Sequence, residues 1–129
     1  MAIQNNVEHG FEFEGNIHFE LSKTSECPKG EPSGKMITDS DGLAFVYLFE
    51  QDAGYGQLRF PEEVWPSMVD ALAKDADPVL AWQGEKIPLV GFKDELMMLI
   101  YNIEGNDNYG EAFSTAVEHA FGSILQSAE

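Results

Sequence analysis

The sequence has few of the residues that build disulfide or metal frameworks. It contains one cysteine, Cys27, and three histidines in 129 residues. A single cysteine cannot form an internal disulfide, so we expect an ordinary thiol in a reducing compartment. His9, His18 and His119 lack the short spacings of zinc ligands. No P-loop, GxSxG or strand-linked GxGxxG is present, so we predict no metal, no cofactor and no catalytic residue.

Basic residues are also scarce, with 7 against 23 acidic residues and a formal charge of −16. The excess is spread along the chain, with −5 over residues 1–42, −5 over 43–90 and −6 over 91–129. Such a field repels phosphate polymers and anionic lipid, so we expect neither direct nucleic-acid binding nor membrane binding. A basic protein partner is compatible with this charge, and so is solubility alone.

Long hydrophobic runs are missing as well. No stretch approaches the roughly 18 apolar residues of a membrane span. The start, MAIQNNVEHG, has neither a basic region nor an apolar run, so we expect no signal peptide and a cytoplasmic location. With 43% hydrophobic residues the chain can bury a core, and its length suits a single domain over residues 1–129.

The first strands are predicted over residues 11–21, where apolar and polar residues alternate with a period of two. A three-residue loop would pair Phe13 with Ile17 and leave His18 on the solvent face. Asn16 would then take the left-handed position that ends such a loop.

The middle of the chain contains a segment rich in proline and glycine followed by an apolar segment. Residues 22–35 contain two prolines and two glycines, which predicts an exposed connector. Residues 43–49 are apolar throughout, as expected of a central strand covered on both faces, and 55–60 suit its antiparallel neighbour.

The remaining segments predict helices and one more hairpin. Helices are predicted over 66–74, 92–103 and 109–125, and strands over 78–82 and 86–90, where Pro88 indicates an edge strand. The predicted fold is therefore α+β in the order ββββαββαα. It has an antiparallel sheet of about six strands with three helices mainly on one face.

Two segments carry candidate binding residues. The loop Gly105–Gly110 places three side chains with amide or carboxylate groups beside an aromatic ring, between two helix ends. Gly105 is expected to be left-handed and to end the preceding helix. The turn Asp39–Gly42 resembles the start of a calcium loop, but Leu43 and Ala44 occupy positions that need an oxygen ligand and a glycine. The candidate binding residues are Asn106, Asp107, Asn108, Tyr109, Asp39 and Asp41.

Two stretches support a resemblance to a known family. MITDSDGLAFVYLFE (residues 36–50) and FKDELMMLIYNIEGNDNYGEAFSTAVEHAF (residues 92–121) resemble uncharacterised protein family 0738, which comprises small acidic proteins of Firmicutes. The connector at 22–35 looks longer here, and Pro66 is added. The resemblance implies a cytoplasmic Firmicute protein and supplies no activity and no catalytic residues.

These observations favour a non-enzymatic acidic adaptor or regulator that binds another cytoplasmic protein. An alternative is a binding protein or an enzyme that takes a small molecule or nucleotide near the GNDNYG loop. A third is a DNA-mimic inhibitor. The sequence also leaves room for a homodimer.

Overall fold

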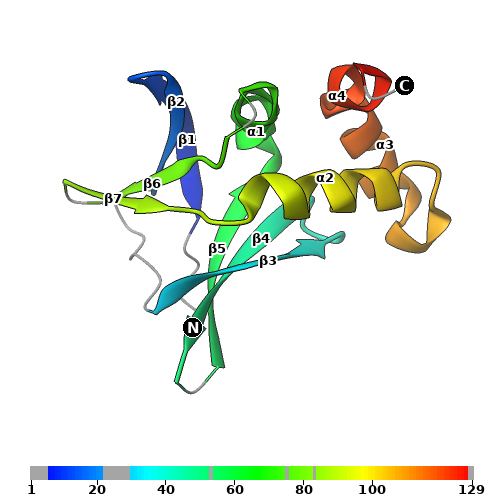
Figure 1. Cartoon of the computed structure of the whole chain (residues 1–129). Helices are drawn as coiled ribbons and strands as arrows, with labels where there is room; N and C mark the ends of the chain where they lie inside the picture. Colours follow the sequence, from blue (N-terminus) through cyan, green and yellow to red (C-terminus); the bar gives the residue numbers. More distant parts are fainter. Residues whose placement is uncertain (1–5, 22–29, 53, 75, 83, 128–129) are drawn as a thin grey trace.

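The structure, a computed structural model, describes residues 6–21, 30–52, 54–74, 76–82 and 84–127, apart from the side chains of residues 107, 126 and 127. It is α+β, as predicted, but its strands form two sheets instead of one (Figure 1). One sheet has four strands in the order β1-β2-β6-β7, and the other has three in the order β3-β4-β5. The strands are β1 (Val7–Phe13), β2 (Asn16–Leu21), β3 (Glu31–Asp39), β4 (Ala44–Gln51), β5 (Gly54–Pro61), β6 (Val79–Trp82) and β7 (Glu85–Pro88).

The strand pairing is not wholly antiparallel. β2 pairs in parallel with β6, whereas the other four pairs of strands are antiparallel. The two sheets are joined by a parallel bridge between Asn6 and Arg59. β4 is central and β7 lies at an edge and ends at Pro88, which confirms both of those predictions.

The register of the first hairpin differs from the prediction. Glu14 and Gly15 both have positive φ, 53° and 81°, and form a two-residue turn in which Phe13 pairs with Asn16. The predicted three-residue loop and left-handed Asn16 are therefore wrong. A two-residue turn with both residues left-handed matches the twist of the flanking strands. Moving the register by one residue sends every side chain of β1 to the opposite face.

The predicted connector is partly a strand. Residues 31–35 form the first half of β3, and residues 22–29 lie outside the described residues. Gly34 has φ 76°, and the register shifts between Pro32 and Lys35. This bulge lets the strand continue through a sequence that is otherwise typical of a loop.

The described helices are more numerous than predicted, because the expected helix over 109–125 is broken near Phe121. The helix over 92–103 is as predicted, and the buried side chains of its core stripe include Leu96, Leu99, Ile100 and Ile103. The element order is βββββαββααα, with two short 3-10 turns. The helical elements are η1 (Glu62–Val64), α1 (Trp65–Ala73), α2 (Phe92–Ile103), η2 (Asp107–Tyr109), α3 (Glu111–Ala120) and α4 (Gly122–Ser127).

The beginning of α2 is held by a residue from another part of the chain. The Asp77 carboxylate accepts hydrogen bonds from the backbone N–H groups of Gly91 (3.2 Å) and Lys93 (3.0 Å). These N–H groups have no partner within the helix, so a carboxylate there stabilises it.

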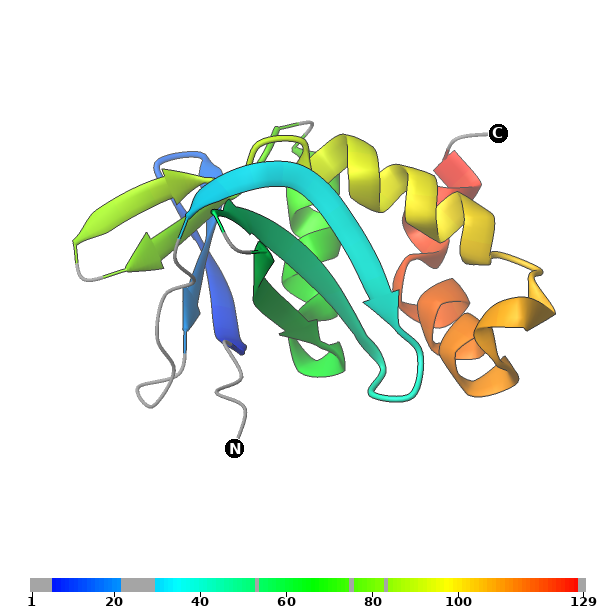
Figure 2. The ribbon, with the colours of Figure 1, turned by 90° about the horizontal axis from the view of Figure 1, so that it is seen from below.

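The core lies between the helices and the inner sides of the sheets. Two groups of aromatic rings fill it. One consists of Phe45, Trp65, Phe113 and Phe121, and the other of Phe19, Phe60 and Phe92. α1 packs on β1 and β2, and α2 lies along β3 (Figures 1 and 2). None of the described helices is long and apolar enough to cross a membrane.

The four-stranded sheet has its helices on one side only (Figure 1). We call the opposite side the outer sheet face. The strand register places on it His9, Phe11, Phe13, Asn16, His18, Glu20, Val79, Ala81, Lys86 and Pro88.

Candidate functional site

The predicted loop between α2 and α3 is held by its own hydrogen bonds. Gly105 has φ 69°, which confirms the left-handed stop, and its N–H donates to Glu118 Oε2 at 3.0 Å. The side chain of Asn106 donates from Nδ2 to the Asn102 carbonyl (3.1 Å) and accepts at Oδ1 from the Asn108 N–H (3.0 Å). Both polar atoms of Asn106 therefore support the local backbone.

The neighbours of Asn106 face different surroundings. The Tyr109 ring is half-buried and lies 6.3 Å from the Phe113 ring, centroid to centroid, so it covers the edge of the core. Asn108 is exposed, and the side chain of Asp107 lies outside the described residues. The prediction that these residues bind a ligand or partner stays a prediction.

The turn between β3 and β4 holds the other two predicted residues. Asp39 Oδ1 accepts from the Gly42 N–H at 3.1 Å, and Oδ2 accepts from Arg59 Nη1 at 2.5 Å. The hydrogen bond from Arg59 lowers the pKa of Asp39 below its usual value, and the Gly42 N–H adds to this. Asp41 is exposed. The Asp39 side chain thus stabilises the turn between β3 and β4.

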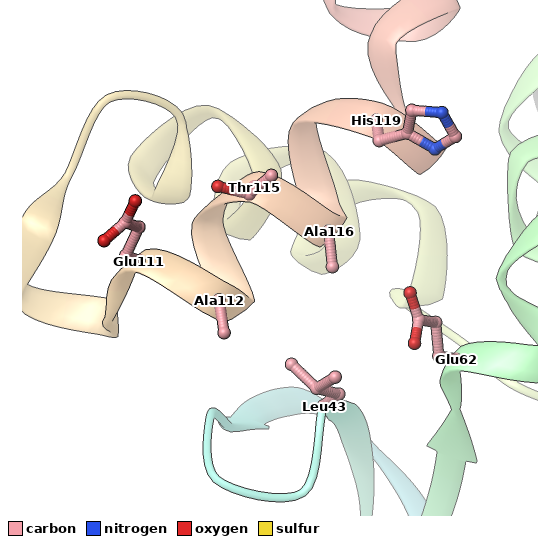
Figure 3. Close-up of a pocket in the computed structure, with 7 residues that line it drawn as sticks. All are labelled: Leu43, Glu62, Glu111, Ala112, Thr115, Ala116 and His119. Atoms are coloured by element: carbon pink, nitrogen blue, oxygen red, sulfur yellow. The ribbon is translucent and has the colours of Figure 1, made fainter.

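A surface hollow lies beside this turn and along α3 (Figure 3). We call it the α3 hollow, and it has a volume of about 760 Å³. Leu43, which follows the turn, and Glu111, which follows the predicted loop, both line the hollow. The six predicted binding residues are not among its described lining. Its lining residues are Leu43, Glu62, Glu111, Ala112, Thr115, Ala116 and His119.

Leu43 enters this hollow from an unusual backbone conformation. Its φ is 49°, in the left-handed region that residues with a bulky side chain rarely adopt. Its N–H donates to the Ser40 carbonyl at 3.4 Å, which closes the turn. Figure 3 shows the Leu43 side chain directed toward Ala112 and Ala116. The turn therefore holds an apolar side chain under the exposed side of α3 despite the conformational cost.

The α3 hollow combines an apolar base with acidic ends. Leu43, Ala112 and Ala116 supply the base, and Figure 3 shows Glu111 at one end and Glu62 at the other. Such an arrangement suits a flexible chain with an aliphatic stem and a cationic head, because the stem contacts carbon and the head meets a carboxylate. Within the described residues no group of three or more His, Cys, Asp or Glu side chains is placed to hold a metal ion.

Sequence reasoning did not identify the residues that line the hollow. One signal was available, because small side chains recur at 112, 115 and 116 on the flank of α3 beside the buried Phe113 and Val117. The approach of Leu43 and Glu62 to that side depends on tertiary packing and has no local signature.

Comparison with known proteins gives a consistent family assignment and no activity. A family model described as "Family of unknown function (UPF0738)" matches residues 5–121. A UPF0738 protein of Lysinibacillus sphaericus is 45% identical over 109 residues, which cover 84% of this chain and 86% of that protein. A UPF0738 protein of Bacillus licheniformis is 39% identical, covering 78% and 86%. The UPF0738 protein YjbL of Bacillus subtilis is 38% identical, covering 70% and 75%. No solved structure matches.

Proposed function

The chain belongs to the UPF0738 family, whose function is unknown, and we propose that it is a non-enzymatic acidic adaptor whose α3 hollow binds a basic segment of another protein. The observation that carries the proposal is the apolar base of the hollow between the carboxylates of Glu62 and Glu111. An arginine or lysine of the partner lays its stem on Leu43 and Ala116 and directs its cationic head to a carboxylate.

The size of the hollow fits one or two side chains of such a segment. Positions 111 and 119 of α3 are eight residues apart, or about 12 Å along a helix that rises about 1.5 Å per residue. This length accommodates a short extended segment or one turn of a partner helix. The net charge of −16 adds a long-range attraction that accelerates the encounter with a basic partner.

The test measures binding of a short peptide rich in arginine and leucine by isothermal titration calorimetry. The double variant Glu62→Gln/Glu111→Gln should weaken binding about fivefold or more, because each change removes a carboxylate and keeps the shape. Ala112→Arg should abolish binding, because the chain then fills its own hollow. Glu63→Gln is the matched control, since Glu63 is an exposed neighbour of Glu62 outside the hollow.

Two further measurements complete the test. Binding should weaken as salt rises from about 0.05 to about 0.5 M, because the Debye length falls to a few ångströms. Spermidine, a polyamine with no peptide backbone, should bind more weakly than the peptide. Equal binding by wild type and Ala112→Arg would refute the proposal, and stronger binding of spermidine would indicate a small-cation site instead.

A further inference from the structure

We propose that the outer sheet face binds a second copy of this chain across a two-fold axis. This inference is independent of the α3 hollow, because it concerns another face and a different kind of partner.

The first observation is that aromatic side chains are exposed on this face. Phe11 is 37% exposed and Phe13 is 47% exposed, although both belong to a regular strand. The other side of the same strand is covered, since a Cβ on Gly10 would lie 2.6 Å from Ser67 Cβ of α1. Interface centres are enriched in aromatic residues, and uncovered rings on a rigid sheet are typical of such centres.

The second observation is that these rings are already fixed in place. Phe11 stacks on His18 with centroids 5.6 Å apart, and Phe13 meets the same ring edge-on at 5.6 Å. Lys86 Nζ lies 4.9 Å from the Phe13 centroid. His18 is only 5% exposed as a result. Side chains that are ordered before binding lose little conformational entropy when a partner docks.

The third observation is the charge of the face. The chain carries 23 acidic residues, but among the side chains that the register directs outward here, Glu20 is the one carboxylate. It lies 2.6 Å from His9 Nε2. Two copies with a charge of −16 each repel one another, so they can meet only where acids are scarce. A basic partner protein would gain little here, which favours a second copy.

The fourth observation is that the face carries both a protruding ring and a hollow, and both a cation and a carboxylate, so two copies can complement each other. A hollow of about 210 Å³ lies where β6 and β7 meet the Glu20 end of the face, and its lining residues are Glu20, Ala81, Trp82, Gly84, Glu85 and Lys86. A two-fold axis requires a patch and its complement on one surface. Here the exposed Phe13 ring of one copy can enter the hollow of the other. The same axis can pair Lys86 of each copy with Glu20 of its neighbour.

The dimensions predict a weak dimer. Four strands about 4.8 Å apart give a face about 20 Å wide. At about 3.3 Å per residue it is about 20 Å long on β1 and β2 but about 13 Å long on the four-residue β6 and β7. Two such faces cover less than about 800 Å² in total, which is smaller than the roughly 1,200 Å² of a standard specific interface, so we expect a weak, transient dimer. Because the net charges repel, dimerisation should strengthen as salt rises. The α3 hollow should show the opposite dependence on salt.

The experiment is sedimentation velocity of the full chain over a range of protein concentrations at low and high salt. Wild type should dimerise, and more tightly at high salt. Phe13→Glu should raise the dimer Kd at least about tenfold, because it puts a carboxylate in place of a ring within the interface. The matched control is Tyr55→Glu, which changes an aromatic residue that is 53% exposed on the other sheet and should leave the dimer unchanged.

A mixing experiment tests the two-fold pairing. Lys86→Glu alone and Glu20→Lys alone should each dimerise less, because like charges then face each other twice. A mixture of the two variants should recover the dimer, because one interface can restore two opposite-charge pairs. The proposal is overturned if wild type remains monomeric at high salt, if Phe13→Glu dimerises normally, or if the mixture does not associate. Binding of the basic peptide should be unchanged in Phe13→Glu, so failure here leaves the proposed function standing.

Discussion

The α3 hollow and the outer sheet face differ in what lies beneath them. The hollow is built from small side chains on one helix and a leucine from a strained turn, with carboxylates at its ends. The sheet face is built from large rings on paired strands, and Glu20 is the one carboxylate among the strand-paired residues that the register directs outward. A chain with a charge of −16 thus has one surface suited to cations and another where acids are few. The two surfaces differ in where their acidic side chains lie: carboxylates stand at both ends of the hollow, whereas the sheet face is mostly aromatic and apolar.

The largest effect is expected from Phe113→Ala, which removes the ring that anchors α3. Phe113 is 1% exposed and lies 5.7 Å from Phe45 and 6.0 Å from Trp65, centroid to centroid. The variant should lose about 3–5 kcal/mol of unfolding free energy in guanidinium titrations. It should weaken peptide binding while the dimer persists. As a control, Tyr101→Ala removes an exposed ring and should cost well under half as much. Equal losses would contradict the anchoring role.

A moderate effect is expected from Gly10→Ala, which tests the support of the outer sheet face. The added Cβ would lie 2.6 Å from Ser67 Cβ, so β1 and α1 must separate. We expect a loss of about 2 kcal/mol and a weaker dimer, with unchanged peptide binding. Gly122→Ala is the control, because nothing lies within 4 Å of its added Cβ. Unchanged stability and dimerisation in Gly10→Ala would show that the sheet and α1 are not in close contact.

A smaller effect is expected from Gly105→Ala at the end of α2. The φ of 69° strains an alanine, and nothing lies within 4 Å of the added Cβ, so the cost is that of the backbone alone. Thermal unfolding should show a loss of about 1 kcal/mol. Gly105→Asn should lose less, since asparagine tolerates this conformation. Both surfaces should keep their binding, and a variant as stable as wild type would exclude the left-handed stop.

The smallest effect is expected from Asp39→Asn in the turn beside the hollow. Its ion pair with Arg59 is partly exposed, so the loss should be about 0.5 kcal/mol near neutral pH. The pKa of Asp39 is lowered from 3.8 in the folded chain, so this stability is present above that value and is lost as the pH falls through the folded pKa. Wild type and variant should therefore converge in acid. A difference that persists at low pH would contradict the ion-pair assignment.

The first hairpin and β3 show where sequence reasoning failed. Alternation predicted the strands of the hairpin but not whether its loop held two residues or three, and that one residue decides which face receives Phe11. Pro32 and Gly34 suggested a loop, although β4 provides a partner with which a bulged strand can pair. The parallel pairing of β2 with β6 joins segments far apart in the chain, and no pattern in the sequence indicates which strands pair.

The sequence by itself determined the α+β class, the span of α2, the central position of β4 and the left-handed stop at Gly105. Each of these follows from periodicity or from the conformational preference of single residues, which act over a few positions. Tertiary structure alone decided the division into two sheets, the approach of Leu43 and Glu62 to α3, and the gathering of Phe13, Glu20 and Lys86 on one face. Those contacts join residues far apart in the chain, and their free energy comes from surfaces that exist only after the segments have packed.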